Sequence, residues 1–375
     1  MKISKVSDII GIINKIAPAS LAESWDNSGF QIGDPSTEVK RIMVALDPAP
    51  DVVDSAIDSS CQLLVTHHPL IFKPLKSISA SNPQGALIQK AIKNGLSIVS
   101  MHTNYDIANG GLNDLLAAKI GLSAFVPLSV TASTELVKLI VFVPTDHLVQ
   151  VRSALLPFAS TQGNYRDCSF SAGGEGTFTP LAGALPFIGK VAELANVMEE
   201  RLELLIDRLQ LPKAIKSMLA AHPYEEPAFD IYPLLNDGEK VGLGRIGRLL
   251  KPLTLAEYAG QIKMNLSAPS LRFVGDSEAV ISKVALCSGS GSSLLRDAAR
   301  AGADVLVTGD IKYHEARDAQ GLGLALIDAG HFSTEIIMVN DIAERLGLAL
   351  NEAGFKDCLV EACRSETDPF LILDC

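Results

Sequence analysis

Two distant stretches of the chain carry the same series of apolar runs, helical segments and polar residues, and this internal repeat limits the fold more than any other feature. The first copy is an apolar run, a helical segment and a second apolar run, at residues 42–46, 52–59 and 63–66. The second copy has the same series at residues 284–286, 293–301 and 305–308. Each copy therefore predicts a βαβ unit.

Both copies continue with another apolar run and then with a His-x-x-x-acid pair. The pairs are His102 with Asp106 and His331 with Glu335. Each pair is followed by Asn-Asp and by a short helix that closes with Gly-Leu. Because a whole series matches in register, we interpret the chain as internally duplicated.

Near-continuous apolar strands that alternate with helices predict an α/β fold whose sheet is parallel or mostly parallel and is buried on both faces. In such sheets, ligands bind beyond the carboxyl ends of the strands. The polar side chains that lie just past an apolar run are His67, His102, Asp310 and His331. We therefore expect the active site at this edge of the sheet.

The pattern changes between the two copies. Strand-like segments fall at residues 136–143, 165–170, 191–197 and 228–232, and helical segments fall at residues 148–159 and 214–221. This order predicts a small ferredoxin-like α+β domain inserted into the duplicated parent. We therefore expect a first half at residues 1–130, the insert at residues 131–240 and a second half at residues 241–375.

Bulk properties fit a globular protein with more than one compact unit. The chain has 375 residues, of which 47% are hydrophobic and 20% charged, and no apolar run approaches the roughly 18 residues of a membrane span. Residues 2–16 predict an amphipathic helix without the apolar stretch of a signal peptide, so we expect a cytoplasmic protein. The six cysteines are scattered, which predicts reduced thiols. The net charge of -11 opposes binding to nucleic acid.

The tetrapeptide Thr66-His67-His68-Pro69 is the most informative motif of the first half. Two adjacent imidazoles at a strand end point in different directions, so they serve two neighbouring metal ions more easily than one. The alternative is a pair of solvated loop histidines.

In the second half, His331 and Glu335 have the i, i+4 spacing of one helix face, and a carboxylate has two oxygens with which to bridge ions.

An imidazole and a carboxylate together suit zinc, iron or manganese. The alternative for His331 and Glu335 is an ordinary helix N-terminus with a favourable Glu in its first turn. That alternative does not explain the matching pair, His102 and Asp106. We therefore expect two divalent ions among His67, His68, Asp106, His331 and Glu335.

Other polar residues near the strand ends are candidates for supporting roles. Asp310 and His314 occupy the position in the second half that the His67 loop occupies in the first, and with His102 they are expected to orient ligands or to face substrate. A surface role is the alternative for His314. Ser288, Gly289, Ser290 and Gly291 could cradle an anion with their amides, although a flexible tight turn is the commoner explanation for such a stretch. Residues 222–227 contain two prolines, which predict a rigid loop or a subunit contact.

Assembled, these motifs resemble the Nif-three-like dinuclear metal-centre family, known in bacteria as GTP cyclohydrolase I type 2 homologues. The motifs that carry the resemblance are Trp25-Asp26-Asn27-Ser28-Gly29, Thr66-His67-His68-Pro69, His102-Thr103-Asn104-Tyr105-Asp106, Ser288-Gly289-Ser290-Gly291 and Gly330-His331-Phe332-Ser333-Thr334-Glu335. The predicted insert is similar to the P-II/CutA-like domain of longer members, on the motifs Gly163-Asn164-Tyr165, Gly174-Glu175-Gly176-Thr177-Phe178 and His222-Pro223-Tyr224-Glu225-Glu226.

The resemblance implies one ion held by His68 and Asp106 and another held by His67 and His331, with Glu335 bridging the two. It also implies a homohexamer whose metal sites face an internal cavity. One departure, Cys287-Ser288-Gly289 in place of a frequent Gly-Gly, bears only on the anion loop.

The leading hypothesis is a metal-dependent hydrolase, in which a water shared by the two ions attacks a phosphoryl group or an imidazole-ring carbon of a small molecule such as a nucleotide. The GTP cyclohydrolase activity in the family name would be one instance of this chemistry. The alternative is a non-catalytic metal-binding scaffold for regulation or assembly, whose insert senses a small molecule.

Overall fold

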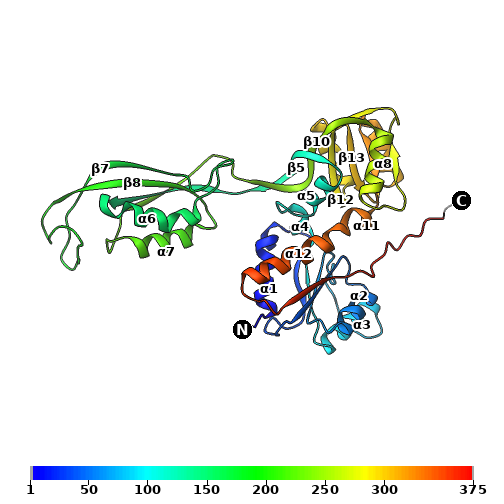
Figure 1. Ribbon diagram of the computed structural model, residues 1–375, viewed down its shortest axis with the longest axis horizontal. Coiled ribbons are helices and arrows are strands. Elements are labelled where there is room, and N and C mark those ends of the chain that lie inside the picture. The colour runs from blue at the N-terminus through cyan, green and yellow to red at the C-terminus, as the bar shows by residue number, and fades with distance from the viewer. Residues whose placement is uncertain (1–2, 374–375) are drawn as a thin grey trace. The chain divides into compact units, whose positions relative to one another are not determined.

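The computed structural model describes residues 3–373 and is a mixed α/β protein with several sheets (Figure 1). Contacts within the chain divide it into two compact units. Unit 1 comprises Met1–Ala132 and Val241–Cys375, and unit 2 comprises Ser133–Lys240.

The first sheet of unit 1 has the strand order β1-β4-β3-β2-β15. Its strands are β1 (Gly29–Ile32), β2 (Arg41–Ala45), β3 (Leu63–Thr66), β4 (Ser97–Ser100) and β15 (Leu359–Ala362). β15, β2, β3 and β4 are parallel, whereas β1 runs antiparallel to β4. Every residue of β3 and β4 is buried, because helices cover both faces of this sheet.

Alternate residues of β2 supply the cores on the two faces of the first sheet. Ile42 and Val44 pack in the same cluster as residues of α1 and α12, and Met43 and Ala45 pack with α2 and α3. The helices of this part are α1 (Val6–Ile16), η1 (Ala19–Leu21), α2 (Pro50–Asp58), α3 (Pro83–Lys93), α4 (Thr103–Ile107), α5 (Leu112–Lys119), α11 (His331–Glu335) and α12 (Ile337–Glu352).

The second sheet of unit 1 has the order β11-β14-β13-β12-β10-β5. Its strands are β5 (Leu122–Ser133), β10 (Lys240–Thr254), β11 (Arg272–Val274), β12 (Val280–Ser290), β13 (Val305–Gly309) and β14 (Ala325–Asp328). The central β12, β13 and β14 are parallel, while β10 and β11 pair with them antiparallel. The helices around it are α8 (Leu255–Asn265), η4 (Ser292–Leu294), α9 (Leu295–Arg300) and α10 (Tyr313–Gly321).

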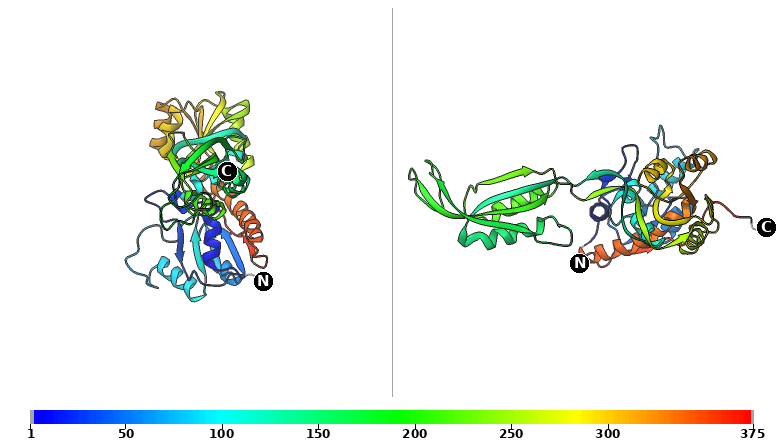
Figure 2. Two further views of the ribbon diagram at one scale, coloured as in Figure 1. Left: turned by 90° about the vertical axis from the view of Figure 1, so that its left-hand side faces the viewer. Right: turned by 90° about the horizontal axis from the view of Figure 1, so that it is seen from above.

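Unit 2 is a four-stranded antiparallel sheet of order β7-β8-β6-β9, with α6 and α7 on one face (Figures 1 and 2). Its elements are β6 (Leu136–Pro144), η2 (Thr145–His147), α6 (Leu148–Leu155), η3 (Leu156–Phe158), β7 (Ser169–Phe178), β8 (Ala195–Asp207), α7 (Leu211–Ala221) and β9 (Phe229–Pro233). Alternate residues of β6 and β8 pack with both helices in one separate core.

Two strand predictions in unit 2 were misplaced. The strand expected at residues 165–170 is β7, which begins at Ser169 and continues through a glycine-rich stretch to Phe178. The strand expected at residues 191–197 is β8, which begins at Ala195 and includes the following glutamates. Pairing between these two strands, from Ser169 opposite Leu204 to Phe178 opposite Ala195, overrides the local loop-like composition.

None of the helices within residues 3–373 is long and apolar enough to span a membrane.

Candidate metal centre

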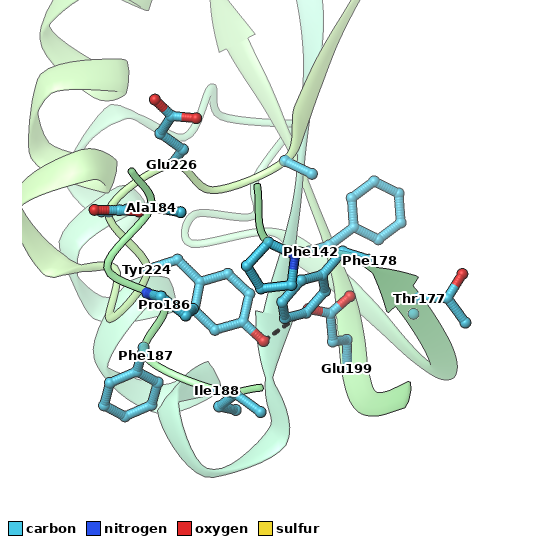
Figure 3. A pocket seen from close by; sticks show the side chains of 14 residues that line it. Phe142, Thr177, Phe178, Ala184, Pro186, Phe187, Ile188, Glu199, Tyr224 and Glu226 are labelled. Atoms are coloured by element: carbon cyan, nitrogen blue, oxygen red, sulfur yellow. Dashed lines mark hydrogen bonds between the residues drawn. The ribbon is translucent and has the colours of Figure 1, made fainter. Parts of the chain in front are cut away.

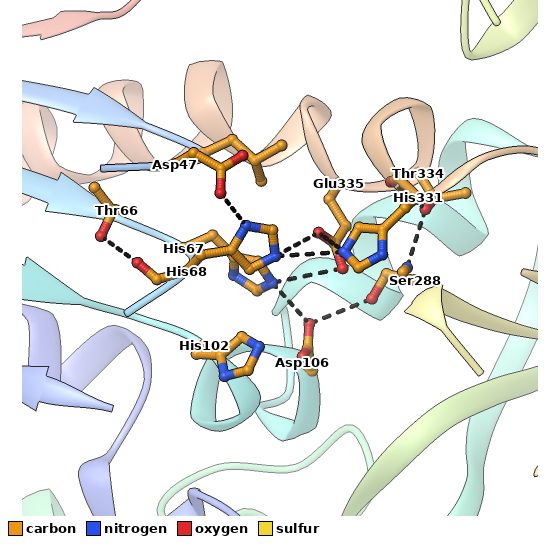
Figure 4. Close-up of polar contacts among 12 residues, drawn as sticks. Asp47, Thr66, His67, His68, His102, Asp106, Ser288, His331, Thr334 and Glu335 are labelled. Atoms are coloured by element: carbon orange, nitrogen blue, oxygen red, sulfur yellow. Dashed lines mark hydrogen bonds and ion pairs between the residues drawn. The ribbon is translucent and has the colours of Figure 1, made fainter. Parts of the chain in front are cut away.

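Four imidazoles and two carboxylates of unit 1 converge at the carboxyl ends of its strands (Figure 4). They come from the loop after β3, from α4 and the residue just before it, and from α11: His67, His68, His102, Asp106, His331 and Glu335. Because β3 and β4 are parallel neighbours, the residues that follow them emerge at the same edge, and the rings of His67 and His102 lie 5.3 Å apart.

The turn before α11 fixes the second pair of side chains. Gly330 has a φ of +83°, a backbone conformation that favours glycine, and α11 starts at the next residue. The i, i+4 spacing then places Glu335 Oε2 2.9 Å from Nε2 of His331.

Glu335 lies at the centre of the cluster. Its Oε2 is 3.1 Å from His68 Nε2 and 2.9 Å from His331 Nε2, and its Oε1 is 3.8 Å from His67 Nε2. His67 Nε2 also lies 3.7 Å from Asp106 Oδ1. The distances therefore form two groups, His68 with His331 and His67 with Asp106, and Glu335 contacts both.

This grouping differs from the pairing that the family resemblance implied, in which His68 goes with Asp106 and His67 with His331. The ring of His68 extends toward His331, with 3.4 Å between the two Nε2 atoms. His67 is instead fully buried beside Asp106. His68 also groups with His67 and His102. Distances between ligand atoms do not assign each ligand to an ion, so the implied pairing stays a prediction.

The Nδ1 atom of every imidazole in the cluster is held by an oxygen at 2.7 Å. The pairs are His67 with Met101 O, His68 with Asp47 Oδ1, His102 with Asp26 Oδ1 and His331 with Asp310 Oδ2. A backbone carbonyl or an ionised carboxylate only accepts, so each Nδ1 donates its proton. In the neutral rings the lone pair is then on Nε2, the atom that faces the centre of the cluster.

The inward-facing atoms fit a divalent cation. His67 Nε2 and Glu335 Oε2 are buried and make no hydrogen bond within the described residues, although imidazole nitrogens surround the carboxylate. Buried polar atoms without partners are costly, and a cation would satisfy both. Imidazole nitrogen and carboxylate oxygen are the ligand types of zinc, iron and manganese sites. The cluster can therefore hold metal.

The charge distribution agrees with this conclusion. Burial would lower the pKa values of His68 and His331, but contacts with carboxylates raise them to about 10 and about 9. The carboxylates are Glu335, Asp47 and Asp310. Burial alone would raise the pKa of Glu335, yet the surrounding imidazoles hold it well below its ordinary value. The site thus attracts positive charge, which a proton or a metal ion can provide.

Gly289 makes room for the Glu335 carboxylate. Its φ is +56°, and a Cβ there would lie 2.1 Å from Glu335 Oε1 and 3.1 Å from His331 Nε2. Only glycine can occupy this position without displacing the carboxylate.

The loop around Gly289 does not form the amide cradle that its sequence suggested. The amide of Ser288 donates to Asn113 Oδ1 at 2.9 Å, that of Gly289 to Thr334 Oγ1 at 3.0 Å and that of Gly291 to Thr308 Oγ1 at 2.8 Å. These donors are already used, so they are not free for an anion. The Ser288 hydroxyl instead donates to Asp106 Oδ1 at 3.3 Å.

The remaining candidates fall in different places. His102 belongs to the cluster, and Asp310 accepts from His331. His314 is exposed on α10, where its ring packs against Tyr313, and it takes no part in the cluster. His222, in unit 2, contacts Phe142 O through Nε2 and the Tyr224 amide through Nδ1, so both of its ring nitrogens are used structurally.

Two residues of the centre were not predicted from the sequence. Asp26 lies in the Trp25-Asp26-Asn27-Ser28-Gly29 motif, which supported the family resemblance without being assigned a role at the metal centre. Asp47 follows β2 by two residues, and its position at the carboxyl end of a strand was the available signal.

A cleft of about 780 Å³ opens beside the cluster. His68, His331 and Asp310 lie in its wall, together with the basic residues Arg272 and Lys312. The C-terminal residues 368–372 form another part of the wall. The metal centre therefore has a cavity large enough for a small organic molecule.

Comparison with known proteins gives a consistent result. The family model described as Duf34/NIF3 (NGG1p interacting factor 3) matches residues 4–369. The chain is 43% identical over 374 residues to a GTP cyclohydrolase 1 type 2 homolog of Halalkalibacterium halodurans, with 100% of each chain covered. A Bacillus subtilis protein of the same description is 41% identical over 366 residues, covering 97% of this chain and 98% of that one. A crystal structure of a Bacillus cereus protein related to NIF3 superposes with a TM-score of 0.93 at 40% identity, covering 100% of both chains.

Proposed function

This chain belongs to the Duf34/NIF3 family, and from that premise we propose that it is a dinuclear-metal-dependent hydrolase of a small molecule. The observation that carries the proposal is the convergence of imidazole Nε2 atoms on the shared carboxylate of Glu335, with every Nδ1 held by an oxygen. Such hydrogen bonds orient metal ligands and increase their basicity.

The proposed ligands are His67, His68, Asp106, His331 and Glu335, and His102 is close enough to join the His67 and His68 side. Two divalent cations bound there would supply Lewis acidity and a water of lowered pKa. The Glu335 carboxylate would contact both ions, and the Ser288 hydroxyl fixes the Asp106 carboxylate. Asp47 and Asp310 hold the rings of His68 and His331 in place.

The cleft beside the cluster suggests the kind of substrate. Lys312 is exposed in its wall, and Arg272 lies there in contact with Asp328. We propose that these two cations hold a phosphate group while the susceptible bond faces His68 and His331. A nucleotide or another phosphoester fits this description, and the relatives' description as GTP cyclohydrolase homologues makes GTP the first substrate to test.

We further propose that the two sheets of unit 1 arose by duplication. In each, three parallel strands follow the same order, and an antiparallel strand flanks the third, β1 beside β4 and β11 beside β14. The proposed segments are residues 1–130, 131–240 and 241–375. Unit 2 has the element order and strand order of a ferredoxin-like fold, which supports its proposal as an inserted domain. The homohexamer is a proposal that rests on the family resemblance, and the cytoplasmic location stays a prediction from the sequence.

The test is turnover by protein of defined metal content. The parent chain, His331→Ala and His314→Ala would each be assayed with GTP and with a simple phosphoester, before and after chelation. We expect activity in the parent and in His314→Ala, which changes an exposed histidine outside the cluster, and loss in His331→Ala and after chelation. Activity that survives removal of metal would contradict the proposal. Absence of turnover in all samples that bind metal would favour the scaffold alternative.

A further inference from the structure

Unit 2 contains a pocket of about 380 Å³ that the proposed chemistry of unit 1 does not use (Figure 3). This volume lies within the range of small-molecule sites. The pocket is formed by β6, β7, β8, the loop between β7 and β8, and the loop after α7. Its apolar wall includes Phe142, Phe178, Pro186, Phe187, Ile188 and Tyr224.

Tyr224 links the aromatic wall to a carboxylate. Its ring centroid is 5.8 Å from that of Phe178, at 61°, and 6.3 Å from that of Phe187, at 48°. Its hydroxyl donates to Glu199 Oε1 at 3.1 Å (Figure 3). His147 packs edge to face against Phe187 at 5.4 Å. Tyr224 therefore contacts two other aromatic rings of the pocket and the carboxylate of Glu199.

The charged side chains that line the pocket are all acidic. Three glutamates line it, Glu199, Glu225 and Glu226, and none of the lining residues is Lys, Arg or His. Glu225 Oε1 accepts from the amide of Leu185 at 2.8 Å, so this side chain fixes the loop between β7 and β8. On the strand of Glu199, the guanidinium of Arg201 pairs with Glu203 at 3.2 Å.

Glu199 is the carboxylate best placed to meet a ligand. It is half-buried on β8, and a Cβ on Gly176 would lie 2.2 Å from its Oε2. The glycine-rich part of β7 thus leaves space that the carboxylate occupies. One oxygen accepts from Tyr224, and a carboxylate oxygen can accept more than one hydrogen bond.

We propose that this pocket binds an organic cation: a protonated amine or a quaternary ammonium group carried on an apolar or aromatic body. Aromatic faces attract such cations, and the carboxylate of Glu199 supplies the opposite charge. Three carboxylates without a basic side chain repel an anion. A neutral ligand would cover Glu199 without giving it a charged partner. The proposal does not depend on hydrolysis by unit 1.

Three indole compounds test the choice of charge with one ring system. Tryptamine is the cation, tryptophol the neutral analogue and indole-3-acetate the anion, and each would be titrated calorimetrically into the full-length chain. We expect tryptamine to bind at least about tenfold more tightly than tryptophol, in line with a desolvated cation–π contact, and indole-3-acetate to bind most weakly. Equal or tighter binding of tryptophol or indole-3-acetate would overturn the proposal, and this comparison needs no variant.

A charge-matched pair of variants locates the binding. Glu199→Gln keeps the acceptor for Tyr224 and removes the charge, so tryptamine affinity should fall about tenfold while that of tryptophol is unchanged. Glu135→Gln removes a carboxylate of unit 2 that pairs with Arg208 and does not line the pocket, so it should change neither affinity. An equal effect of both variants, or none of Glu199→Gln, would overturn the assignment. A third result would also overturn the assignment: tryptamine does not bind, and the chain forms an oligomer that Phe187→Ser abolishes. In that case a second copy of the chain would cover the pocket.

Discussion

At the residue scale, the proposed metal centre depends on the carboxylates that orient its imidazole rings. Asp47 accepts from His68 Nδ1 and Asp310 accepts from His331 Nδ1, each at 2.7 Å. The two rings differ in sequence context but have the same kind of support. The orientation of the Nε2 atoms therefore depends on residues that would not themselves touch a metal ion.

Replacing Asp47 by Asn should weaken metal binding about 10- to 100-fold, because an amide oxygen is a weaker acceptor for the Nδ1 proton than a carboxylate. Titration against a competing chelator would measure the change. Asp58→Asn, at the exposed end of α2, is the matched control and should leave the affinity unchanged. Equal affinities of parent and Asp47→Asn would show that this hydrogen bond does not support a metal ligand.

The metal-free protein should lose stability as the pH rises from about 6.5 to about 10. The pKa values of His68 and His331 are raised from 6.5 to about 10 and about 9 in the folded chain. Folding therefore favours their protonated forms, and this contribution is complete below pH 6.5 and is lost as the pH rises through the folded pKa values.

Urea unfolding of the chelated protein at several pH values would measure this dependence. His331→Gln removes one of the two groups, so its free energy of unfolding should fall less steeply over the same range. Bound metal requires neutral imidazoles, so metal affinity should rise with pH where stability of the metal-free chain falls. Parallel pH profiles for the parent and the variant would contradict the proposed role of His331.

Residue identities in the centre were partly readable from the sequence. The His-x-x-x-acid pairs and the adjacent His67 and His68 stand out because their spacing repeats or is unusual. Asp47 has neither a repeated nor an unusual spacing, and its position after a strand is too common to distinguish it from other aspartates. The grouping of His68 with His331 depends on ring orientations set by contacts between residues far apart in the chain, which local spacing does not encode.

At the scale of elements, the turn after β12 sets the space for Glu335. Gly289→Ala would place a Cβ 2.1 Å from Glu335 Oε1 and force a residue with a φ of +56° to carry a side chain. We expect loss of bound metal and a decrease in stability of at least about 1 kcal/mol. Metal analysis and urea unfolding of the same sample would check both.

Gly260→Ala is the control for this substitution. Gly260 lies in α8, where a Cβ would meet nothing within 4 Å, so the change should stabilise the helix by up to about 1 kcal/mol and leave metal binding unaltered. Full metal content in Gly289→Ala would show that the close approach to Glu335 is not required.

Buried parallel strands were the elements most readily predicted. The runs at residues 42–46, 63–66 and 305–308 coincide closely with β2, β3 and β13, because strands covered on both faces are continuously apolar. Strands that depend on pairing were harder to place. β7 contains three glycines that suggest a loop, and its extended conformation follows from its ladder with β8.

At the scale of the whole molecule, the two units have separate cores, and every residue of the metal centre lies in unit 1. The ends of unit 2 are adjacent, since the amide of Thr134 donates to Glu239 O at 2.9 Å. A short linker in place of residues 133–240 should therefore leave a folded unit 1 that binds as much metal per chain as the parent. A folded deletion protein without metal would contradict the independence of the centre from unit 2.

The most direct test of the metal centre is the metal content of purified protein after loading with zinc, iron or manganese, measured per chain by elemental analysis. The account predicts about two ions per chain in the parent and in His314→Ala, and fewer in His331→Ala. A parent that retains no ion, or a His331→Ala variant with the same content as the parent, would contradict it.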